Sequence, residues 1–191
     1  MREHIPRNAI RSPRLLLRFW RDEDLDPFVK MSNDAKVMEF FPSLHSREDC
    51  QAMQGRIRTH FETHGYGYWA VEIPGVTSFA GFIGLAVPRF EANFTPCVEV
   101  GWRLMAEYWG HGYATEGAEA ALKFGFETIG LNEIVSMTAT INTRSQRVMQ
   151  KLGMTCNRDE DFDHPLVPAG HALQRHVLYR LKKDNRLSPR R

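Results

Sequence analysis

The sequence predicts a mixed α/β fold, with a mostly antiparallel sheet, one pair of parallel strands and helices packed against the sheet. Three strand-like runs between residues 68 and 105, separated by turn residues, are typical of an antiparallel meander. A strand-like run, a helix-like run and another strand-like run follow between residues 97 and 140, the pattern of a parallel strand–helix–strand unit. With 191 residues, 42% hydrophobic and 25% charged, the chain has the length and composition of one globular domain.

One strand and two helices are expected before the meander. The apolar run at residues 14–20 predicts the strand. A first helix is predicted over residues 22–33, with Asp22 as its N-cap and acidic residues in its first turn. A second helix is predicted over residues 46–64, with Ser46 as its N-cap and glycines just after its last turn.

The strands of the meander are expected at residues 68–73, 79–87 and 97–105. Both faces of 79–87 are apolar, so this strand is predicted to be central and buried. One face of 97–105 is apolar, and the other carries Glu99 and Arg103. The remaining expected elements are a helix at 114–129 ended by Gly130, a strand at 133–140, a helix from an Asn142 cap to about residue 152, and two strands near 154–158 and 176–181.

Charge and cysteine content exclude several functional classes. The net charge is only +2 and the basic residues are scattered, so no nucleic-acid partner is expected. The three cysteines lie far apart in sequence, which favours a cytoplasmic protein without a disulfide framework or a metal site. No apolar run approaches the ~20 residues of a membrane span, so no membrane partner is expected. We expect one domain over residues 13–182, an N-terminal extension at 1–12 and a disordered basic tail at 183–191.

The most informative local sequence is YWGHGYATEG, at residues 108–117, where a helix begins directly after a turn. Gly110 and Gly112 allow a ligand to approach the backbone, and the first N–H groups of the helix have no internal partner. The turn therefore predicts a phosphate site. Thr115 stands where a dinucleotide fingerprint needs its third glycine, and Ala118 stands where a P-loop needs lysine, so neither of those sites is supported. A tight turn without a ligand is the alternative.

Four stretches of the chain share their order and spacing with one family: RSPRLLLRFWRDEDLDPF near the start, VEVGWRLMAEYWGHGYATEG, INTRSQRVMQKLGM and the terminal HVLYRL. With these stretches the chain resembles the GNAT superfamily of acetyl-CoA-dependent N-acyltransferases, and within it the Rim type, the bacterial ribosomal-protein N-terminal acetyltransferases. The resemblance covers about residues 12–181. Glu107 departs from the glutamine or arginine that opens the family's phosphate loop, but the loop binds mainly through backbone amides.

The resemblance implies a sheet that splays open between the strands at 97–105 and 133–140, with acetyl-CoA entering the opening. It implies that the pantetheine arm pairs with the backbone near 103–105 and that the pyrophosphate lies on the amides of residues 110–114. The residues expected to contact acetyl-CoA are Arg103, Leu104, Met105, Trp109, Gly110, His111, Gly112, Tyr113, Ala114, Thr115, Asn142 and Lys151.

Direct acetyl transfer needs a base for the amine and a donor for the departing thiolate, but no nucleophile from the enzyme. Ser145 is the candidate donor, because the resemblance implies a serine near the CoA sulfur here; the alternative is a first-turn serine that bonds its own backbone. Glu99 is the candidate base, because burial should raise its pKa; the alternative is a solvated carboxylate on a half-exposed strand. A second source of a base is the acidic loop of Asp159, Glu160, Asp161 and Asp163.

We also expect particular roles for His111, for Glu116 and for the aromatic residues of the N-terminal half. His111 is given no catalytic role, and Glu116 is expected to favour the dipole of its helix. The resemblance implies that the N-terminal region roofs the acceptor pocket. The aromatic residues there either shape that pocket or belong to the core: Phe40, Phe41, Tyr66, Tyr68 and Trp69.

The predicted function is transfer of an acetyl group from acetyl-CoA directly to a primary amine, either a protein N-terminus or a small molecule. The alternative is a catalytically silent acyl-CoA-binding or sensor module, and the presence of both Ser145 and Glu99 argues against it. The resemblance also implies a homodimer as the expected assembly.

Overall fold

The computed structural model of the chain describes residues 9–183. Its strands are Ile10–Arg11 (β1), Leu16–Arg18 (β2), Tyr68–Ile73 (β3), Thr77–Ala86 (β4), Glu99–Leu104 (β5), Glu133–Ala139 (β6), Thr155–Cys156 (β7), Phe162–Asp163 (β8) and Arg175–Lys182 (β9). Its helices are Leu25–Ser32 (α1), Arg47–His64 (α2), Tyr113–Phe124 (α3) and Thr143–Lys151 (α4). A π-helical turn, Gly125–Ile129, extends α3, and short 3-10 turns lie at Asp22–Asp24, Ala106–Tyr108 and Arg158–Glu160.

Within this part of the chain, nine strands form one sheet in the order β1-β2-β3-β4-β5-β6-β9-β7, and β8 pairs with β9. Neighbouring strands are antiparallel except β5 and β6, which are parallel. The predicted fold class is therefore confirmed. The predicted extension at 1–12 is described only from residue 9, and the predicted tail at 183–191 only at residue 183, so most of both segments lies outside the described residues.

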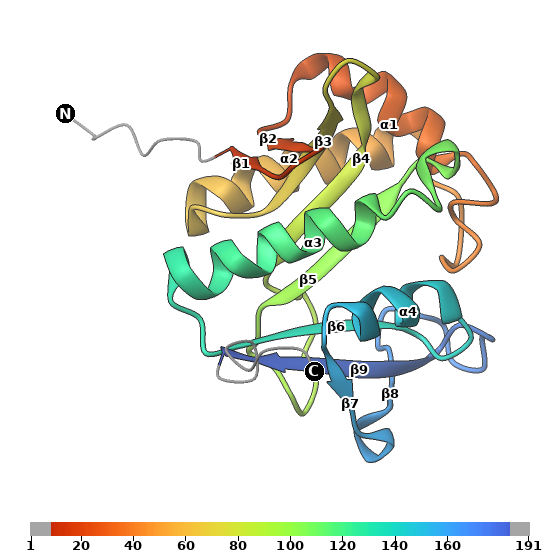
Figure 1. Cartoon of the computed structure of the whole chain (residues 1–191). Coiled ribbons are helices and arrows are strands. Elements are labelled where there is room, and N and C mark those ends of the chain that lie inside the picture. Colours follow the sequence, from red (N-terminus) through yellow and green to blue (C-terminus); the bar gives the residue numbers. More distant parts are fainter. Residues whose placement is uncertain (1–8, 184–191) are drawn as a thin grey trace.

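Helices cover both faces of the sheet: α1 and α2 lie on one face, and α3 and α4 lie on the other (Figure 1). Alternate residues of β4 face the two layers. Phe82 packs edge-on against Phe28 of α1, with ring centroids 6.0 Å apart, and Ile83 lies against Gly117 of α3. As predicted, β4 is central and buried on both faces.

The second predicted helix begins and ends as its sequence indicates. The Ser46 hydroxyl accepts a hydrogen bond from the Asp49 N–H at 3.1 Å, and the Asp49 carboxylate accepts one from the Ser46 N–H at 2.9 Å. Gly65 ends α2 with a positive φ of 75°. None of the described helices is long and apolar enough to cross a bilayer.

The first predicted helix begins differently from the prediction. Residues 22–24 form a 3-10 turn, and α1 begins only at Leu25. The Arg21 N–H donates a hydrogen bond to the Asp24 carboxylate at 2.8 Å, and not to Asp22. The reason is that Asp24 is buried in a bidentate ion pair with Arg18, at 2.7 and 2.8 Å, which draws this carboxylate inward. The predicted N-cap Asp22 instead pairs with Arg58 on the surface.

Short strands near both ends of the described chain also differ from prediction. Of the strand predicted at 14–20, only Leu16–Arg18 pairs with β3, because Arg14 turns away to bind Glu116 of α3. Of the strand predicted at 154–158, only Thr155–Cys156 pairs with β9. The two-residue strand β8 was not predicted. These strands have few ladder bonds and no periodic pattern long enough to show in the sequence.

The predicted opening of the sheet between β5 and β6 is confirmed. The two strands share a single aligned pair, Glu99 with Val135. The Val135 N–H donates to the Val98 carbonyl at 2.9 Å, and one step further the Ser136 hydroxyl bonds the Val100 carbonyl at 2.9 Å. Beyond this point the strands diverge (Figure 1). A side-chain hydroxyl therefore makes the last link between the two halves of the sheet.

Candidate active site

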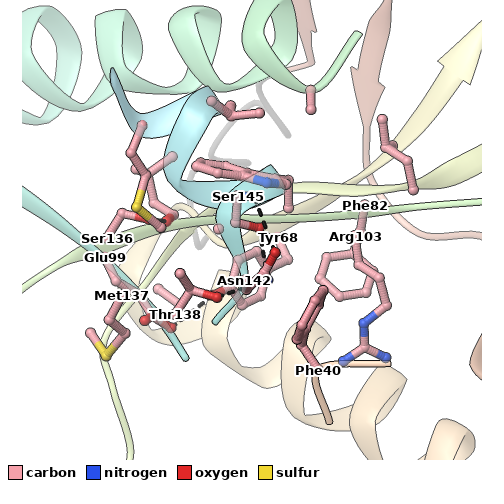
Figure 2. A pocket seen from close by; sticks show the side chains of 18 of the residues that line it. Phe40, Tyr68, Phe82, Glu99, Arg103, Ser136, Met137, Thr138, Asn142 and Ser145 are labelled. Atoms are coloured by element: carbon pink, nitrogen blue, oxygen red, sulfur yellow. Dashed lines mark hydrogen bonds between the residues drawn. The ribbon is translucent and has the colours of Figure 1, made fainter. Parts of the chain in front are cut away.

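A cavity of about 810 Å³ occupies the opening between β5 and β6. It extends from the start of α3 and the α4 helix, through the gap in the sheet, to the face covered by α1 and α2. Figure 2 shows side chains from β3, β4, β5, β6 and the start of α4 converging on this space. The cavity thus joins the two layers of the molecule through the sheet.

The glycine turn at the start of α3 forms one end of the cavity. Gly110 and Gly112 both have a φ of 82°, a conformation that side chains disfavour. A Cβ on Gly110 would meet nothing within 4 Å, so the space beside it is open. Gly112 is the N-cap of α3 and supplies no capping side chain. The first N–H groups of α3 therefore keep their hydrogen-bonding capacity for an anion, which fits a phosphate.

Two side chains from the first described strand region hold the turn in place. Arg14 donates to the His111 carbonyl at 3.0 Å and to Glu116 at 2.7 Å. Ser12 also donates to Glu116, at 2.7 Å. Glu116 lies in the first turn of α3, as expected for a helix-dipole partner, and it also ties the N-terminal segment to α3. The His111 side chain is exposed against Tyr113 and does not line the cavity, so a contact of His111 with the cofactor would be made by its backbone amide.

The free edge of β5 offers only alternate backbone groups to the opening. The Met105 N–H donates to the Ala80 carbonyl of β4 at 2.9 Å, and Arg103 aligns with Phe82 of the same strand. Because backbone groups of successive residues alternate in direction, those of Trp102 and Leu104 face the gap. The Leu104 carbonyl is bonded by Trp109 Nε1 at 2.8 Å. Met105 is buried against α1 and α2 and is absent from the cavity wall, which corrects its predicted contact.

Asn142 and Ser145 lie where α4 begins, beside the gap. The Asn142 side-chain oxygen accepts from the Ser145 N–H at 3.2 Å, so Asn142 caps α4 as predicted. Its Nδ2 donates to Thr138 at 2.9 Å and to the Ser145 Oγ at 3.2 Å. Since the Ser145 Oγ accepts this bond, its own hydrogen is available to the cavity that it lines. Among residues 9–183, the Ser145 hydroxyl makes no hydrogen bond to the backbone of its own helix.

Glu99 and Tyr68 lie on the other side of the sheet. The Tyr68 hydroxyl donates to Glu99 Oε1 at 2.7 Å, and both residues line the cavity (Figure 2). Burial raises the pKa of Glu99, and the hydrogen bond from Tyr68 partly opposes that rise. The pKa of Tyr68 lies well above its usual value because of burial and the neighbouring carboxylate. This arrangement gives the cavity a carboxylate with a raised proton affinity.

The aromatic residues expected near the acceptor pocket divide into two groups. Phe40, Phe41 and Tyr68 line the cavity, whereas Tyr66 and Trp69 are buried in the core outside it. The loop before α2, which carries the two phenylalanines, is held against the start of α4. There Arg144 pairs with Glu39 and lies over the rings of Phe40 and Trp109, at 5.3 and 4.7 Å.

The acidic loop after α4 is not part of the cavity wall. Its carboxylates make ion pairs with basic residues nearby: Glu160 with Arg180, Asp161 with Arg158, and Asp163 with Arg175. Asp159 is exposed and also lies outside the wall. Of the two sources considered for a base, only Glu99 reaches the cavity.

Several cavity residues were not found from the sequence. Ser136, Thr138, His164 and His176 line the wall. The two histidine rings lie 4.8 Å apart, and burial together with the His176 charge lowers the pKa of His164 to about 4. Nothing in the local sequence marks these residues, because the pairing of β9 with β6 and with β8 brings them together. Among residues 9–183, no cluster of three or more metal-ligating side chains forms a metal site.

Comparisons with known proteins agree with this architecture. A family model described as acetyltransferase (GNAT) domain matches residues 14–155. An uncharacterized N-acetyltransferase of Bacillus subtilis, YnaD, is 28% identical over 176 residues, covering 92% of this chain and 97% of the relative. An Aspergillus fumigatus protein named FsC-acetyl coenzyme A-N(2)-transacetylase is 34% identical over 136 residues, covering 69% of this chain but only 55% of that protein.

A solved structure shows the same fold at low identity. It is described as RimL, a ribosomal L7/L12 alpha-N-protein acetyltransferase, in complex with coenzyme A. It superposes with a TM-score of 0.73 and 15% identity, covering 93% of this chain and 99% of that one. At this identity the likeness concerns the fold alone.

Proposed function

Because the chain belongs to the GNAT acetyltransferase family, we propose that it transfers an acetyl group from acetyl-CoA directly to a primary amine. The observation that carries this proposal is the continuity of one cavity from the glycine turn, through the gap in the sheet, to Glu99. A cofactor with a phosphate end and a reactive thioester end fits a cavity with an anion site at one end and a raised-pKa carboxylate at the other.

On the α3 side, the proposal assigns the pyrophosphate to the first amides of α3. The backbone groups of Trp102 and the Leu104 N–H face the gap as donors and acceptors for the pantetheine arm, so the pairing stretch shifts from the expected 103–105 to Trp102 and Leu104. Lys151 lines the same region and adds positive charge near the phosphates. Trp109 is held by its bond to Leu104 and contributes a fixed wall.

On the α1/α2 side, Glu99 accepts the proton that the amine loses as its nitrogen attacks the thioester carbon. As the new C–N bond forms, the C–S bond breaks and the thiolate departs. The Ser145 hydroxyl donates a hydrogen bond to the departing thiolate, which takes up a proton from water, and Glu99 releases the amine proton to water. In this scheme Asn142 is a positioning residue, because it orients the Ser145 hydroxyl without touching the reacting atoms.

The acceptor is proposed to be a protein N-terminus or a small-molecule amine. The four Rim-type stretches support a protein α-amine, and the solved structure with the same fold is described as acting on a ribosomal protein. The Aspergillus relative is instead named for transfer to an N(2) position of FsC. Because one fold serves many acceptors, the two classes need a direct comparison.

The experiment is thiol release from acetyl-CoA measured over a panel of amines and N-terminal peptides, together with CoA binding by calorimetry. Turnover on at least one amine, lost in Glu99→Gln, is the expected result. CoA binding without turnover on any amine would instead favour a silent acyl-CoA-binding module. Absence of both binding and turnover would overturn the proposal.

A further inference from the structure

The Arg103 side chain is a buried cation in the wall of the cavity. It is 7% exposed, and it lies on the α1/α2 side of β5, the same side as Glu99. Its guanidinium carbon lies 4.0 Å from the ring centroid of Phe41 and 5.3 Å from that of Phe82. Figure 2 shows the side chain extending past Phe82 toward the α2 side of the cavity. Aromatic rings therefore hold the guanidinium in position.

No anion of the described chain compensates this charge. Nε and Nη1 of Arg103 are buried and have no hydrogen-bond partner among residues 9–183. The nearby His45 also has an unpartnered Nδ1, and its pKa is lowered by burial and by the Arg103 charge. Burial lowers the pKa of Arg103 to about 10, so the guanidinium is still charged at neutral pH. A buried unpaired cation is costly, and a bound anion would offset that cost.

The cavity wall as a whole has more basic side chains than carboxylates. Among the described residues that line the cavity, the only carboxylate is Glu99, and it is engaged by Tyr68. The basic residues of the wall are Arg56, Arg89, Arg103, Arg144, Arg147 and Lys151. Those beside α3 and α4 lie near the expected phosphates of CoA, but Arg103 lies on the opposite side of the sheet. The phosphates therefore do not account for it.

We propose that the acceptor amine carries a carboxylate group, and that Arg103 binds this carboxylate while the amine lies at Glu99. This inference rests on the proposed function and adds the chemical class of the acceptor. A guanidinium whose Nε and Nη1 lack partners suits a carboxylate, because hydrogen bonds between two charged groups are strong. Phe41 and Phe82 exclude water from the pair and strengthen it.

The spacing on β5 also suggests how far apart the two groups of the acceptor lie. Glu99 and Arg103 are four residues apart on one face of a strand, so their Cα atoms are about 13 Å apart. The end of the Tyr68 side chain lies over Gly101, between Glu99 and Arg103, and keeps the two groups apart. The geometry therefore favours an amine separated from its carboxylate by several bonds. An ω-amino acid or a short peptide with an acidic side chain has this form.

The test compares matched acceptors that differ only in the carboxylate. One series is the ω-amino acids from β-alanine to 6-aminohexanoate, and its control series is the corresponding carboxamides. A second pair is an N-terminal peptide with glutamate at its third position and the same peptide with glutamine. We expect kcat/KM to be about tenfold to hundredfold higher for the carboxylates, with an optimum chain length. The peptide pair shows whether the carboxylate belongs to a small molecule or to a protein.

In Arg103→Met, the ratio of kcat/KM for the carboxylate to kcat/KM for the matched carboxamide should fall to about one. In Arg103→Lys, part of the wild-type ratio should remain. Replacing an unpaired buried cation by an apolar residue of similar length should preserve the fold, which thermal unfolding and CoA calorimetry would verify. Arg47→Met is the control, because Arg47 pairs with Asp26 on the outer surface of α2.

Binding provides a readout that does not need turnover. N-acetyl-6-aminohexanoate in the presence of CoA should raise the Tm of the wild type more than its carboxamide does, and Arg103→Met should remove the difference. Equal use of carboxylates and amides, or a preference that survives in Arg103→Met, would overturn this inference and leave the acetyltransferase proposal standing. Loss of CoA binding and of all turnover would count against the acetyltransferase proposal itself.

Discussion

The Tyr68 hydroxyl reaches Glu99 across two intervening glycines. Tyr68 lies on β3 and aligns with Gly84 of β4, which in turn aligns with Gly101 of β5. A Cβ on Gly84 would lie 2.8 Å from the Tyr68 Cα, and a Cβ on Gly101 would lie 2.8 Å from the Tyr68 hydroxyl oxygen. The end of the aromatic ring therefore lies over Gly101, and the 2.7 Å bond to Glu99 depends on the absence of a side chain there.

Gly101→Ala is expected to displace the Tyr68 hydroxyl and so lower kcat. The new methyl group would contact the tip of the ring, which can shift, so the fold should survive while the bond to Glu99 is lost. We expect kcat to fall about tenfold or more, because the base is then poorly oriented. CoA affinity by calorimetry should change little, because the change is on the acceptor side.

The matched control is Gly55→Ala in α2, where a Cβ would meet nothing within 4 Å. This change should leave kcat unaltered and stabilise the fold by up to about 1 kcal/mol, because alanine has the higher helix propensity. Equal kcat in Gly101→Ala and Gly55→Ala would show that the Tyr68 position is unimportant for turnover.

Tyr68→Phe is expected to move the acidic limb of the pH–rate profile to higher pH. The Tyr68 hydrogen bond lowers the pKa of Glu99 against the raising effect of burial. Removing the hydroxyl leaves burial unopposed, so Glu99 holds its proton to a higher pH and the base is ionised later. The measurement is kcat/KM against pH, with Tyr66→Phe as the control because Tyr66 is buried outside the cavity. A limb that stays in place, or moves to lower pH, would contradict the assignment of Glu99 as the base.

The longer elements of the fold follow from periodicity and capping signals. The second helix has a capping box at Ser46 and a glycine end, and the β4 strand has two apolar faces, so both were predicted close to their observed bounds. By contrast, Asp24 and not the predicted Asp22 accepts the hydrogen bond at the start of the first helix, because Asp24 pairs with Arg18 of β2. Arg18 lies only six residues before Asp24, but the two side chains pair because the fold buries both, and no periodic or capping pattern shows that burial.

In the candidate site, too, local features are visible in the sequence, whereas features that depend on strand pairing are not. The glycine turn and the Asn142–Ser145 pair are local, so their patterns are visible in the sequence. The bond from Tyr68 to Glu99 requires the register of three strands, and the exclusion of Met105 requires the alternation of backbone bonds along β5. Likewise, two carboxylates of the acidic loop pair with arginines of β9 that are distant in sequence, Glu160 with Arg180 and Asp163 with Arg175.

Gly110→Ala is expected to weaken CoA binding. The residue has a φ of 82° and borders the open space beside the turn, so a side chain would both strain the backbone and occupy the cradle. The control is Gly75→Ala, with a φ of 78° and no neighbouring atom within 4 Å, in the β3–β4 turn. Both variants should lose about 1 kcal/mol of stability from strain. Only Gly110→Ala should raise the Kd for CoA in calorimetry, and a similar effect of Gly75→Ala would point to strain alone.

Ser145→Ala is expected to lower kcat and leave CoA affinity nearly unchanged. The hydroxyl is proposed to donate to the departing thiolate, an interaction made only as the C–S bond breaks, so we expect a loss of about tenfold or more in kcat. The helix should remain intact because its cap is the Asn142 side chain. Thr143→Ala, an exposed change in the same turn, is the control. Equal losses of kcat and CoA affinity would reduce Ser145 to a structural residue.

Glu99→Gln is expected to stabilise the protein increasingly as the pH rises. In the folded state, burial raises the pKa of Glu99 above its ordinary value. A raised carboxyl pKa favours the protonated folded form, so its stabilising contribution is fully present below the unfolded-state pKa near 4.5 and is lost as pH rises through the folded-state pKa. Glutamine does not titrate and still accepts the Tyr68 hydrogen bond through its oxygen.

The measurement is Tm of the wild type and of Glu99→Gln between pH 4 and pH 8. The difference in Tm should be smallest at the acidic end and grow toward pH 8, by about 2–4 °C for each kcal/mol. The same variant should lose about a hundredfold or more in kcat, because it cannot accept the proton of the amine. If Glu99 is a base whose burial destabilises the fold, then Glu99→Gln should make the protein more stable and less active. A Tm difference that does not vary with pH would mean that Glu99 is as easily ionised in the folded chain as in the unfolded chain.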